Sequence, residues 1–182
     1  MTTLYLDMDG VLADFNKQAQ TVLGASNQDT HAAAQRGRWP EEQWRKLKAD
    51  PHFYRTLPKT EIADELVNVA RTLRDEFGWQ LFILTAIPKA NDMPDAFHDK
   101  ILWVQDYFPD LRVHFGPYSN DKFRHAKPGD VLIDDRKDNC TQWEAAQGLA
   151  IKVDDTNRTK AVDTLKQILE KKRSLKRLNE LN

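Results

Sequence analysis

The chain has 182 residues, of which 40% are hydrophobic, and this length favours one domain with room for a small insertion. Its formal net charge of −1 excludes a global field that would draw it to nucleic acid or a membrane, and the single cysteine, Cys140, excludes an intrachain disulfide. No apolar run approaches the roughly 18 residues of a membrane span, so we expect a cytoplasmic protein that makes no membrane contact, with its oligomeric state left open.

The most informative stretch comes first, at residues 3–15 (TLYLDMDGVLADF). Thr3–Leu6 is apolar and β-branched, which indicates a buried strand. Asp7 and Asp9 follow two residues apart, so both carboxylates would face the same way if the strand continued. Gly10 then permits a sharp turn. Such paired carboxylates repel each other unless a cation lies between them, although Asp is also common in turns and helix caps.

Residues 15–58 show helical and polar patterns without strand alternation. A helix is expected over 16–24, and Pro40 can open a second one that carries Trp44 and Leu47 on one face. We interpret 15–58 as a small helical cap inserted directly after the first strand. Its aromatic side chains are expected to be mostly core, with one or two lining a pocket: Phe15, Trp39, Trp44, Phe53 and Tyr54.

The rest of the chain alternates between helical and strand patterns. The expected elements are helices over 61–77, 95–108, 142–147 and 159–181, a turn of helix around 121–125, and strands over 79–86, 112–116, 130–135 and 149–153. This alternation predicts an α/β fold with a Rossmann-like three-layer parallel sheet, in which 1–14 and 59–182 form the core.

Polar side chains occur where the expected strands end. Asp7 and Asp9 follow the first strand, Thr85 lies at the end of the second, and Asp134 and Asp135 end the fourth. The carboxyl ends of parallel strands meet at one edge of the sheet, where α/β folds bind ligands. Carboxylates without nitrogen or sulfur ligands indicate Mg²⁺, and a hydroxyl with a nearby lysine suits a phosphoryl group.

The order of these motifs resembles that of the haloacid dehalogenase (HAD) superfamily of phosphatases. DMDGV is similar to its first motif, LFILT to its second and VLIDD to its fourth. More narrowly, DMDGVLADF, RGRWPEEQW, LTAIPK and YSNDKFRHAKPGDVLIDDR resemble the 5′(3′)-deoxyribonucleotidase family. The similarity runs from about residue 3 to residue 153.

This resemblance implies a role for each matched residue. Asp7 would be the nucleophile that forms an aspartyl-phosphate, and Asp9 would be the general acid and base, with its backbone carbonyl on the metal. Thr85 would hydrogen-bond the transferred phosphoryl group. Asp134 and Asp135 would hold Mg²⁺ directly or through water, with Asp135 favoured for direct contact by the family pattern.

The third-motif cation is assigned to Lys122 by the resemblance. Arg124 and Lys127, in the same polar loop, are its rivals. Lys122 would bind the remaining phosphate oxygens.

The substrate-binding positions depart from the family pattern. Ala86 replaces the usual hydroxyl residue after Thr85, so one phosphate hydrogen bond would be lost or come from the backbone. Phe15 is kept and Trp39 is a candidate for the pocket wall, but Arg38 and Lys48 fall where aromatic residues are expected. These two cations would meet a second phosphate or a nucleic-acid strand, or else be ordinary surface charge.

These observations predict a Mg²⁺-dependent phosphatase acting on 5′- or 3′-(deoxy)nucleoside monophosphates, a hydrolase of nucleotide metabolism. The second enzyme hypothesis is a polynucleotide 3′-phosphatase or another small phosphoester hydrolase on the same core. The hypothesis from a different class is a non-catalytic phosphate- or nucleotide-binding protein.

Overall fold

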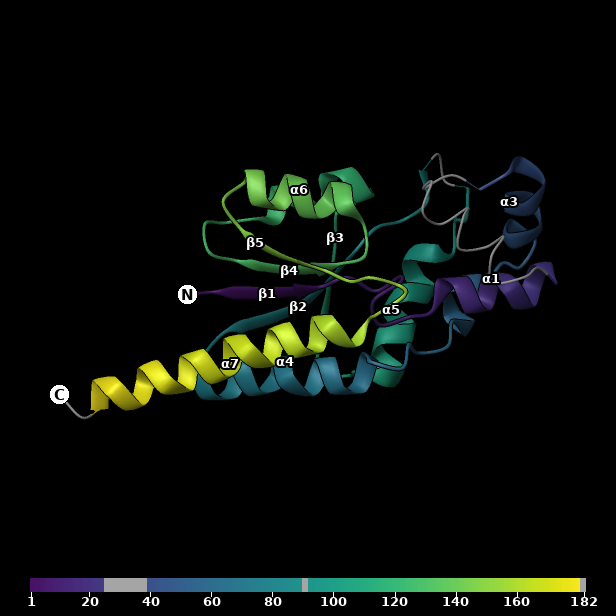
Figure 1. The fold of residues 1–182 in the computed structure, drawn as a ribbon. Coiled ribbons are helices and arrows are strands. Elements are labelled where there is room, and N and C mark those ends of the chain that lie inside the picture. The colour runs from purple at the N-terminus through teal and green to yellow at the C-terminus, as the bar shows by residue number, and fades with distance from the viewer. Residues whose placement is uncertain (25–38, 90–91, 181–182) are drawn as a thin grey trace.

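A five-stranded parallel sheet forms the centre of the molecule (Figure 1). The computed structural model describes residues 1–24, 39–89 and 92–180. The strands run in the order β3-β2-β1-β4-β5. Their bounds are β1 Thr3–Leu6, β2 Gln80–Thr85, β3 Arg112–Phe115, β4 Val131–Asp134 and β5 Leu149–Lys152. The α/β prediction is therefore confirmed, and β1 lies at the middle of the sheet.

Side chains of the central strands alternate between two apolar layers. Leu4 and Leu6 of β1 join the larger hydrophobic cluster, whereas Tyr5 between them joins the smaller one with Trp143. The alternation follows from the two-residue period of a strand, and burial on both faces explains why β1 has no exposed position.

Helices cover both faces of the sheet. In Figure 1, α4 and α7 lie together on one side and α6 lies on the other. The 3₁₀ helix η3 packs against α6, and α5 packs against β3. The bounds are α4 Ala63–Phe77, α5 Ala96–Tyr107, η3 Ser119–His125, α6 Lys137–Ala145 and α7 Thr159–Glu180. Among the described helices, none combines the length and apolarity needed to cross a membrane.

Between β1 and α4 the described residues form three short helices: α1 Phe15–Leu23, α3 Glu41–Lys48 and η1 Phe53–Thr56. The Asp14 side chain caps α1 by accepting from Lys17 N, and Gly24 ends it in a left-handed conformation. Phe53 and Tyr54 are buried in the larger hydrophobic cluster, so η1 packs into the same core as the sheet.

The largest difference from the expected elements concerns α6, which begins at Lys137 instead of residue 142. The backbone N–H of Arg136 donates to Asp134 Oδ1 at 2.9 Å, and this contact turns the chain from β4 almost directly into the helix. The first turn of α6 is polar and so lacks the apolar spacing that would mark it as helical.

Candidate active site

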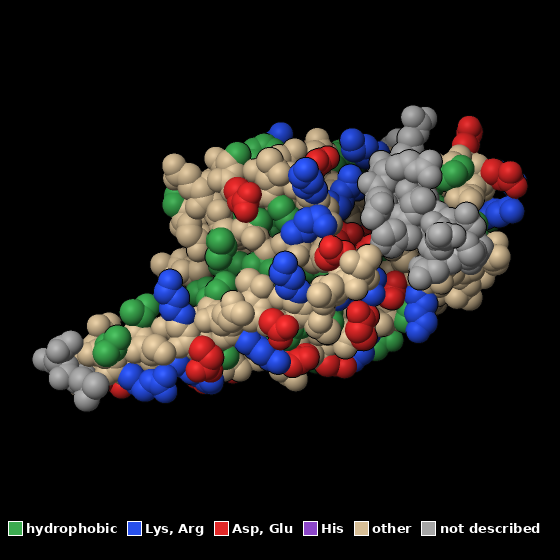
Figure 2. Space-filling view, viewed as in Figure 1, with side chains coloured by type: hydrophobic (Ala, Val, Ile, Leu, Met, Phe, Trp, Pro, Cys, Tyr) green, Lys and Arg blue, Asp and Glu red, His purple; other side chains and the backbone are tan. Residues whose placement is uncertain are grey.

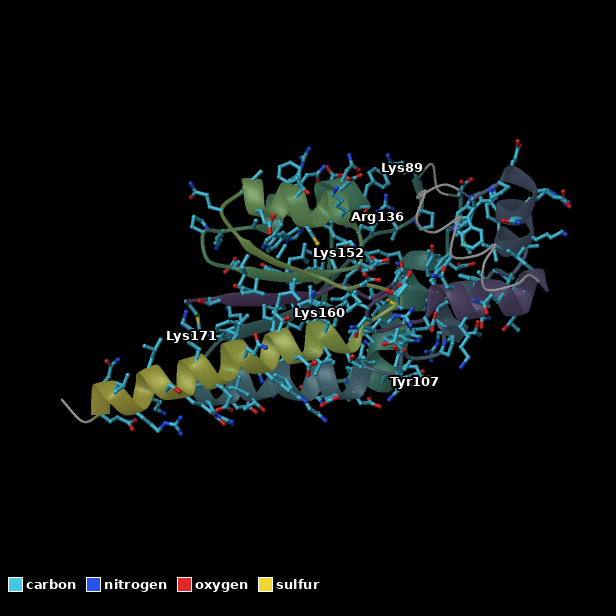
Figure 3. All side chains as sticks on the ribbon, viewed as in Figure 1. Lys89, Tyr107, Arg136, Lys152, Lys160 and Lys171 are labelled. Atoms are coloured by element: carbon cyan, nitrogen blue, oxygen red, sulfur yellow. The ribbon has the colours of Figure 1, made fainter. Side chains whose placement is uncertain are left out.

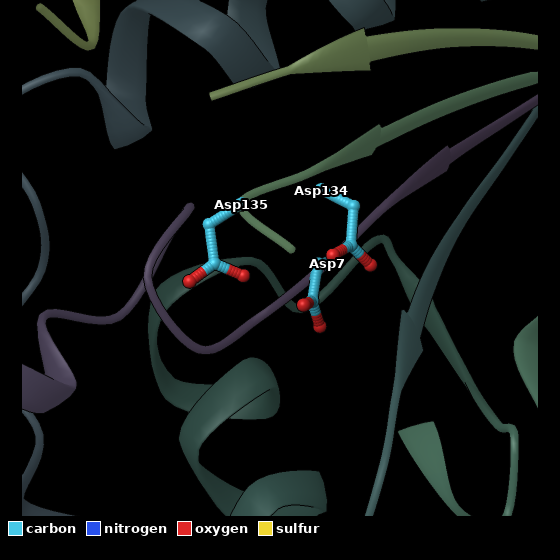
Figure 4. A group of neighbouring side chains, drawn as sticks. All are labelled: Asp7, Asp134 and Asp135. Atoms are coloured by element: carbon cyan, nitrogen blue, oxygen red, sulfur yellow. The ribbon is translucent and has the colours of Figure 1, made fainter. Parts of the chain in front are cut away.

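Three carboxylates meet beyond the ends of β1 and β4 (Figure 4). One oxygen from each of Asp7, Asp134 and Asp135 lies within 4.8 Å of the others. Asp7 N donates to Ile133 O at 2.9 Å, so the hydrogen bonding between the two strands continues to the first carboxylate. Asp7 and Asp134 are buried and Asp135 is half-buried. Parallel pairing of neighbouring strands thus gathers residues that are far apart in the sequence.

Lys122 links two of these carboxylates. Its Nζ lies 2.7 Å from Asp7 Oδ2 and 2.8 Å from Asp134 Oδ2, and the residue is 2% exposed. Burial alone would lower the pKa of Lys122, but Asp134 and Asp7 outweigh it and hold the pKa above its ordinary value. Arg124 pairs instead with Asp121 at 3.1 Å, and Lys127 is exposed. Of the three candidate cations, the structure brings only Lys122 into the acidic cluster.

Asp134 is occupied by protein donors. Its carboxylate accepts from Arg136 N at 2.9 Å, from Asn139 Nδ2 at 3.0 Å and from Lys122. Asp135, in contrast, has no carboxylate hydrogen bond or ion pair with any described residue, and it lines the cavity above the cluster. Asp134 is therefore suited to orienting Lys122, and Asp135 has the free oxygens that a metal ion needs.

Gly10 brings the backbone close to Asp135. The φ angle of Gly10 is +78°, and a Cβ added there would lie 2.5 Å from Asp135 Oδ2. A side chain at this position would be strained and would also displace the carboxylate. The turn predicted from DMDGV therefore lets the backbone at Gly10 lie against the carboxylate of Asp135.

Burial and the clustered charges shift the pKa values of two carboxylates in the site. Burial raises the pKa of Asp7 to about 7; the Lys122 ammonium opposes this shift, and Asp134 and Asp9 reinforce it. Burial also raises the pKa of Asp135 well above its usual range, together with the charges of Asp134 and Asp7. A divalent cation would relieve this repulsion, and the all-oxygen donor set fits Mg²⁺. The residues present therefore fit the ion that the sequence predicts.

Asp9 is held by Lys100, a residue that the sequence analysis did not select. Lys100 Nζ lies 2.5 Å from Asp9 Oδ2, 3.0 Å from Thr85 Oγ1 and 2.7 Å from the Ala86 carbonyl oxygen. It is fully buried, 4.5 Å from the centre of the Tyr54 ring. Asp9 Oδ1 is buried without a protein partner among the described atoms. Lys100 thus fixes one oxygen of Asp9 and leaves the other free.

A sequence signal for Lys100 does exist. Ala96, Trp103 and Val104 form the buried stripe of α5, and Lys100 occupies the same stripe at helical spacing. A lysine on an apolar helix face must be paired when it is buried. The pattern could have indicated a partner carboxylate, though it could not have named Asp9.

Thr85 and Ala86 take different positions at the end of β2. Thr85 is fully buried, and its hydroxyl accepts from Lys100. Ala86 lines the cavity, and its carbonyl also accepts from Lys100. Thr85 therefore lies one layer beneath the cavity wall, and the cavity surface there is the Ala86 methyl and backbone.

A cavity of about 870 Å³ opens above the acidic cluster. Phe15, Trp39 and Tyr54 line it, with the Phe15 ring 5.7 Å from Trp39 and 6.1 Å from Tyr54. Lys48 does not line this cavity; its Nζ binds Asp92 Oδ1 at 3.0 Å. Arg38 lies outside the described residues. Four of the five aromatic candidates, Phe15, Trp39, Trp44 and Tyr54, therefore line the cavity, which is more than the one or two expected. Phe53 lies in the core, and Lys48 is paired beside the cavity.

Comparisons with known proteins agree with this geometry. The chain matches the family model described as "5' nucleotidase, deoxy (Pyrimidine), cytosolic type C protein" over residues 1–168. It is 30% identical over 156 residues to a protein named "Putative 5'(3')-deoxyribonucleotidase" in two strains of Staphylococcus epidermidis, covering 80% of this chain and 79% of the relative.

Solved structures show the same fold. A hydrolase from Pseudomonas syringae superposes with a TM-score of 0.50 at 12% identity, covering 91% of this chain and 90% of that one. L-2-haloacid dehalogenase from Xanthobacter autotrophicus gives a TM-score of 0.50 at 13% identity, covering 84% and 78%. The fold is that of the HAD-like hydrolases, and the chain belongs to the 5′ nucleotidase, deoxy (pyrimidine), cytosolic type C family of phosphoric monoester hydrolases.

Proposed function

We propose that the protein is a Mg²⁺-dependent phosphatase that hydrolyses 5′- or 3′-(deoxy)nucleoside monophosphates through an aspartyl-phosphate on Asp7. The observation that carries the proposal is the meeting of Asp7, Asp134 and Asp135 within 4.8 Å at one end of an aromatic-lined cavity. Family membership supports the nucleotide class of substrate. The cavity wall of Phe15 and Trp39 offers ring faces for a base.

The first half-reaction forms the covalent intermediate. A carboxylate oxygen of Asp7 attacks phosphorus, and the bond from phosphorus to the ester oxygen breaks. Asp9 gives a proton to the departing alcohol oxygen. Lys122, held beside Asp7, faces the negative charge of the phosphoryl oxygens, and a bound Mg²⁺ would supply further charge neutralisation between carboxylates and phosphate.

The second half-reaction returns the enzyme to its starting state. Asp9, now ionised, takes a proton from water, and the resulting hydroxide attacks phosphorus. The bond between Asp7 and phosphorus breaks, which releases inorganic phosphate. Lys100 keeps Asp9 Oδ2 in place through both steps, because it also binds Thr85 at the end of β2 and Ala86 directly after it. Asp9 Oδ1 is the oxygen available for proton transfer.

The division into core and cap is part of this proposal. Residues 15–58 would form the cap and 1–14 with 59–182 the core. Support comes from the cavity wall, where Phe15, Trp39 and Trp44 belong to the inserted segment and the carboxylates belong to the core. A cap of this kind would exclude bulk water and select the leaving group.

The test is phosphate release from a panel of 5′- and 3′-monophosphates of the common deoxynucleosides, with Mg²⁺ and with EDTA. We expect turnover that needs Mg²⁺ and that disappears in Asp7→Asn. An exposed carboxylate away from the site supplies the matched control, Asp163→Asn, which should keep full activity. Undiminished turnover by Asp7→Asn would overturn the assigned nucleophile.

A 3′-phosphorylated oligonucleotide in the same assay tests the polynucleotide alternative. A faster rate on the oligonucleotide than on any mononucleotide would favour that alternative. Binding of nucleotides without any phosphate release would favour the non-catalytic hypothesis.

A further inference from the structure

Two cations at the cavity wall have no part in the chemistry described above. Lys89 and Arg136 both line the cavity and are exposed. Neither side chain forms an ion pair or hydrogen bond with the residues that the structure describes. Figure 3 shows both near the same end of α6, far from Lys171 on α7. Unpaired cations facing a cavity are available to a bound anion.

The cations of the catalytic cluster are already paired with carboxylates. Lys122 is held between Asp7 and Asp134, and Lys100 binds Asp9. Lys122, Lys100 and a bound divalent ion would together carry four positive charges, which equal the four negative charges of the carboxylates Asp7, Asp9, Asp134 and Asp135. Lys89 and Arg136 add two positive charges beyond that balance at the wall of the cavity. Figure 2 shows Lys and Arg side chains near a small group of Asp and Glu side chains on this face of the molecule.

Their position in the fold places them on two sides of the nucleophile. Lys89 follows β2 and Arg136 follows β4, the two strands that flank β1 and Asp7. Strands separated by one neighbour are about 9.6 Å apart, so long side chains from both can reach a group between them. Asp92, an acidic neighbour on the same wall, is neutralised by Lys48 at 3.0 Å.

We propose that Lys89 and Arg136 form a second phosphate subsite, so that the preferred substrate is a nucleotide with another phosphate one sugar away from the one removed. This inference rests on the proposed nucleotidase function and narrows its substrate class. Arg136 is suited to bidentate binding of phosphate oxygens, and Lys89 to a single ionic contact. The second phosphate is either the other monoester of a nucleoside 3′,5′-bisphosphate or the linkage of a short oligonucleotide.

The test compares kcat/KM for thymidine 5′-monophosphate, thymidine 3′-monophosphate, thymidine 3′,5′-bisphosphate and the 5′-phosphorylated dinucleotide. We expect the bisphosphate to exceed both monophosphates by about tenfold, mainly through KM, since the second phosphate is bound before and during the reaction. The double variant Lys89→Gln/Arg136→Gln should remove this preference. Lys137→Gln, an exposed cation next to Arg136 that does not line the cavity, should retain it.

The dinucleotide distinguishes the two possible forms of the second phosphate, the monoester of a bisphosphate and the linkage of an oligonucleotide. Equal preference for the dinucleotide and the bisphosphate would show that a bridging phosphate also fits, and preference for the bisphosphate alone would restrict the subsite to small nucleotides. Either result supports the subsite. An equal kcat/KM for all four substrates, or a preference that survives in the double variant, would overturn it.

Binding measured by calorimetry in an inactive variant tests the second phosphate subsite independently of turnover. In Asp7→Asn, the bisphosphate should bind about tenfold more tightly than the monophosphates, and adding the two Gln substitutions should abolish the difference. Absence of turnover in the wild type with this binding pattern would refute the nucleotidase function and retain the subsite. Turnover without this binding pattern would refute the subsite alone.

Discussion

Lys100 Nζ and Asp9 Oδ2 lie 2.5 Å apart, and the lysine has no exposed surface. The pair connects the middle of α5 to the turn after β1, so the candidate acid is oriented by an element outside the motif that contains it. The ring of Tyr54 covers the lysine at 4.5 Å. Thr85 and Ala86 accept from the same ammonium group, so the three hydrogen bonds of Lys100 go to Asp9 and to the end of β2.

Replacing this lysine should impair proton transfer to the leaving group. We expect Lys100→Met to reduce kcat/KM for a nucleoside monophosphate by about 10²–10⁴, because Asp9 loses the contact that positions it for protonating the leaving group. The kcat/KM for p-nitrophenyl phosphate, whose leaving group needs no proton, should fall less than about tenfold, since kcat/KM covers only the steps up to departure of the leaving group. Steady-state kinetics on both substrates measure the difference.

A structural defect would have another signature. If Lys100→Met simply destabilised the fold, both substrates would lose activity equally and the thermal midpoint would fall with them. Lys160→Met, which changes an exposed lysine on α7, controls for the loss of a positive charge and should match the wild type on both substrates.

The contrast between Asp7 and Lys100 shows what the sequence could predict. Asp7, Asp134 and Asp135 were predictable because each follows an apolar strand, and parallel strands end at one edge. Lys100 lies within α5, and its partner Asp9 is 91 residues away. Helical spacing places Lys100 on the buried face of α5, but it does not indicate which distant residue contacts it.

The sequence could not show which carboxylates Lys122 and Lys48 would pair with. Lys122 could be chosen from its motif, and its bridge between Asp7 and Asp134 needed the packing of η3 against α6. Lys48 was expected at the substrate because it replaces an aromatic residue of the family. Its pairing with Asp92 depends on the approach of α3 to the loop after β2, which composition and periodicity do not define.

An ion pair network distant from the site predicts how stability changes in acid. Arg71 and Arg74 of α4 bind Asp110, and hydrogen bonding to Arg71 is the main reason that the Asp110 pKa is lowered to about 2. A depressed pKa in the folded state contributes stability above the unfolded value of about 4, and this contribution disappears as the pH falls toward 2.

The variant Asp110→Asn should therefore be less stable than the wild type at pH 6, by no more than about 1 kcal/mol because the pair is screened by solvent. The difference should shrink between pH 4 and pH 3. Urea unfolding at pH 6, 4 and 3 measures it. A difference that stays constant over this range would show that the carboxylate charge is not the cause.

Asp92 joins the inserted segment to the sheet. It accepts from Trp44 Nε1 and from Lys48 Nζ, each at 3.0 Å, and hydrogen bonds to these two residues lower its pKa. Trp44 and Asp92 both line the cavity. We expect Asp92→Ala to raise KM about five- to tenfold with little change in kcat, because the wall of the cavity is loosened and the reacting groups are untouched.

Asp95→Ala is the matched control for Asp92, since it removes an exposed carboxylate at the start of α5 that does not line the cavity. It should leave KM unchanged. A loss confined to kcat in Asp92→Ala would mean that the contact acts on the chemical step and not on closure of the cavity.

The two adjacent carboxylates at the end of β4 should respond differently to mutation, because only Asp134 accepts hydrogen bonds from protein donors. Asp134→Asn weakens the hold on buried Lys122 and should reduce the free energy of unfolding by about 3 kcal/mol without metal. Asp135→Asn removes a carboxylate whose pKa is raised by burial and by Asp134, so its ionised form costs stability as the pH rises. Asp135→Asn should therefore be at least as stable as the wild type at pH 8 without metal.

Adding Mg²⁺ should make the wild type more stable than Asp135→Asn. At 100 times its dissociation constant the ion stabilises a protein that binds it only when folded by about 2.7 kcal/mol. In a chain of this length that shift raises the thermal midpoint by about 5–10 °C. We expect the rise in the wild type and its loss in Asp135→Asn, measured by thermal unfolding with Mg²⁺ and with EDTA. A full rise in Asp135→Asn would place the ion on other ligands, since Asp135 is the carboxylate of the cluster whose oxygens have no described protein partner.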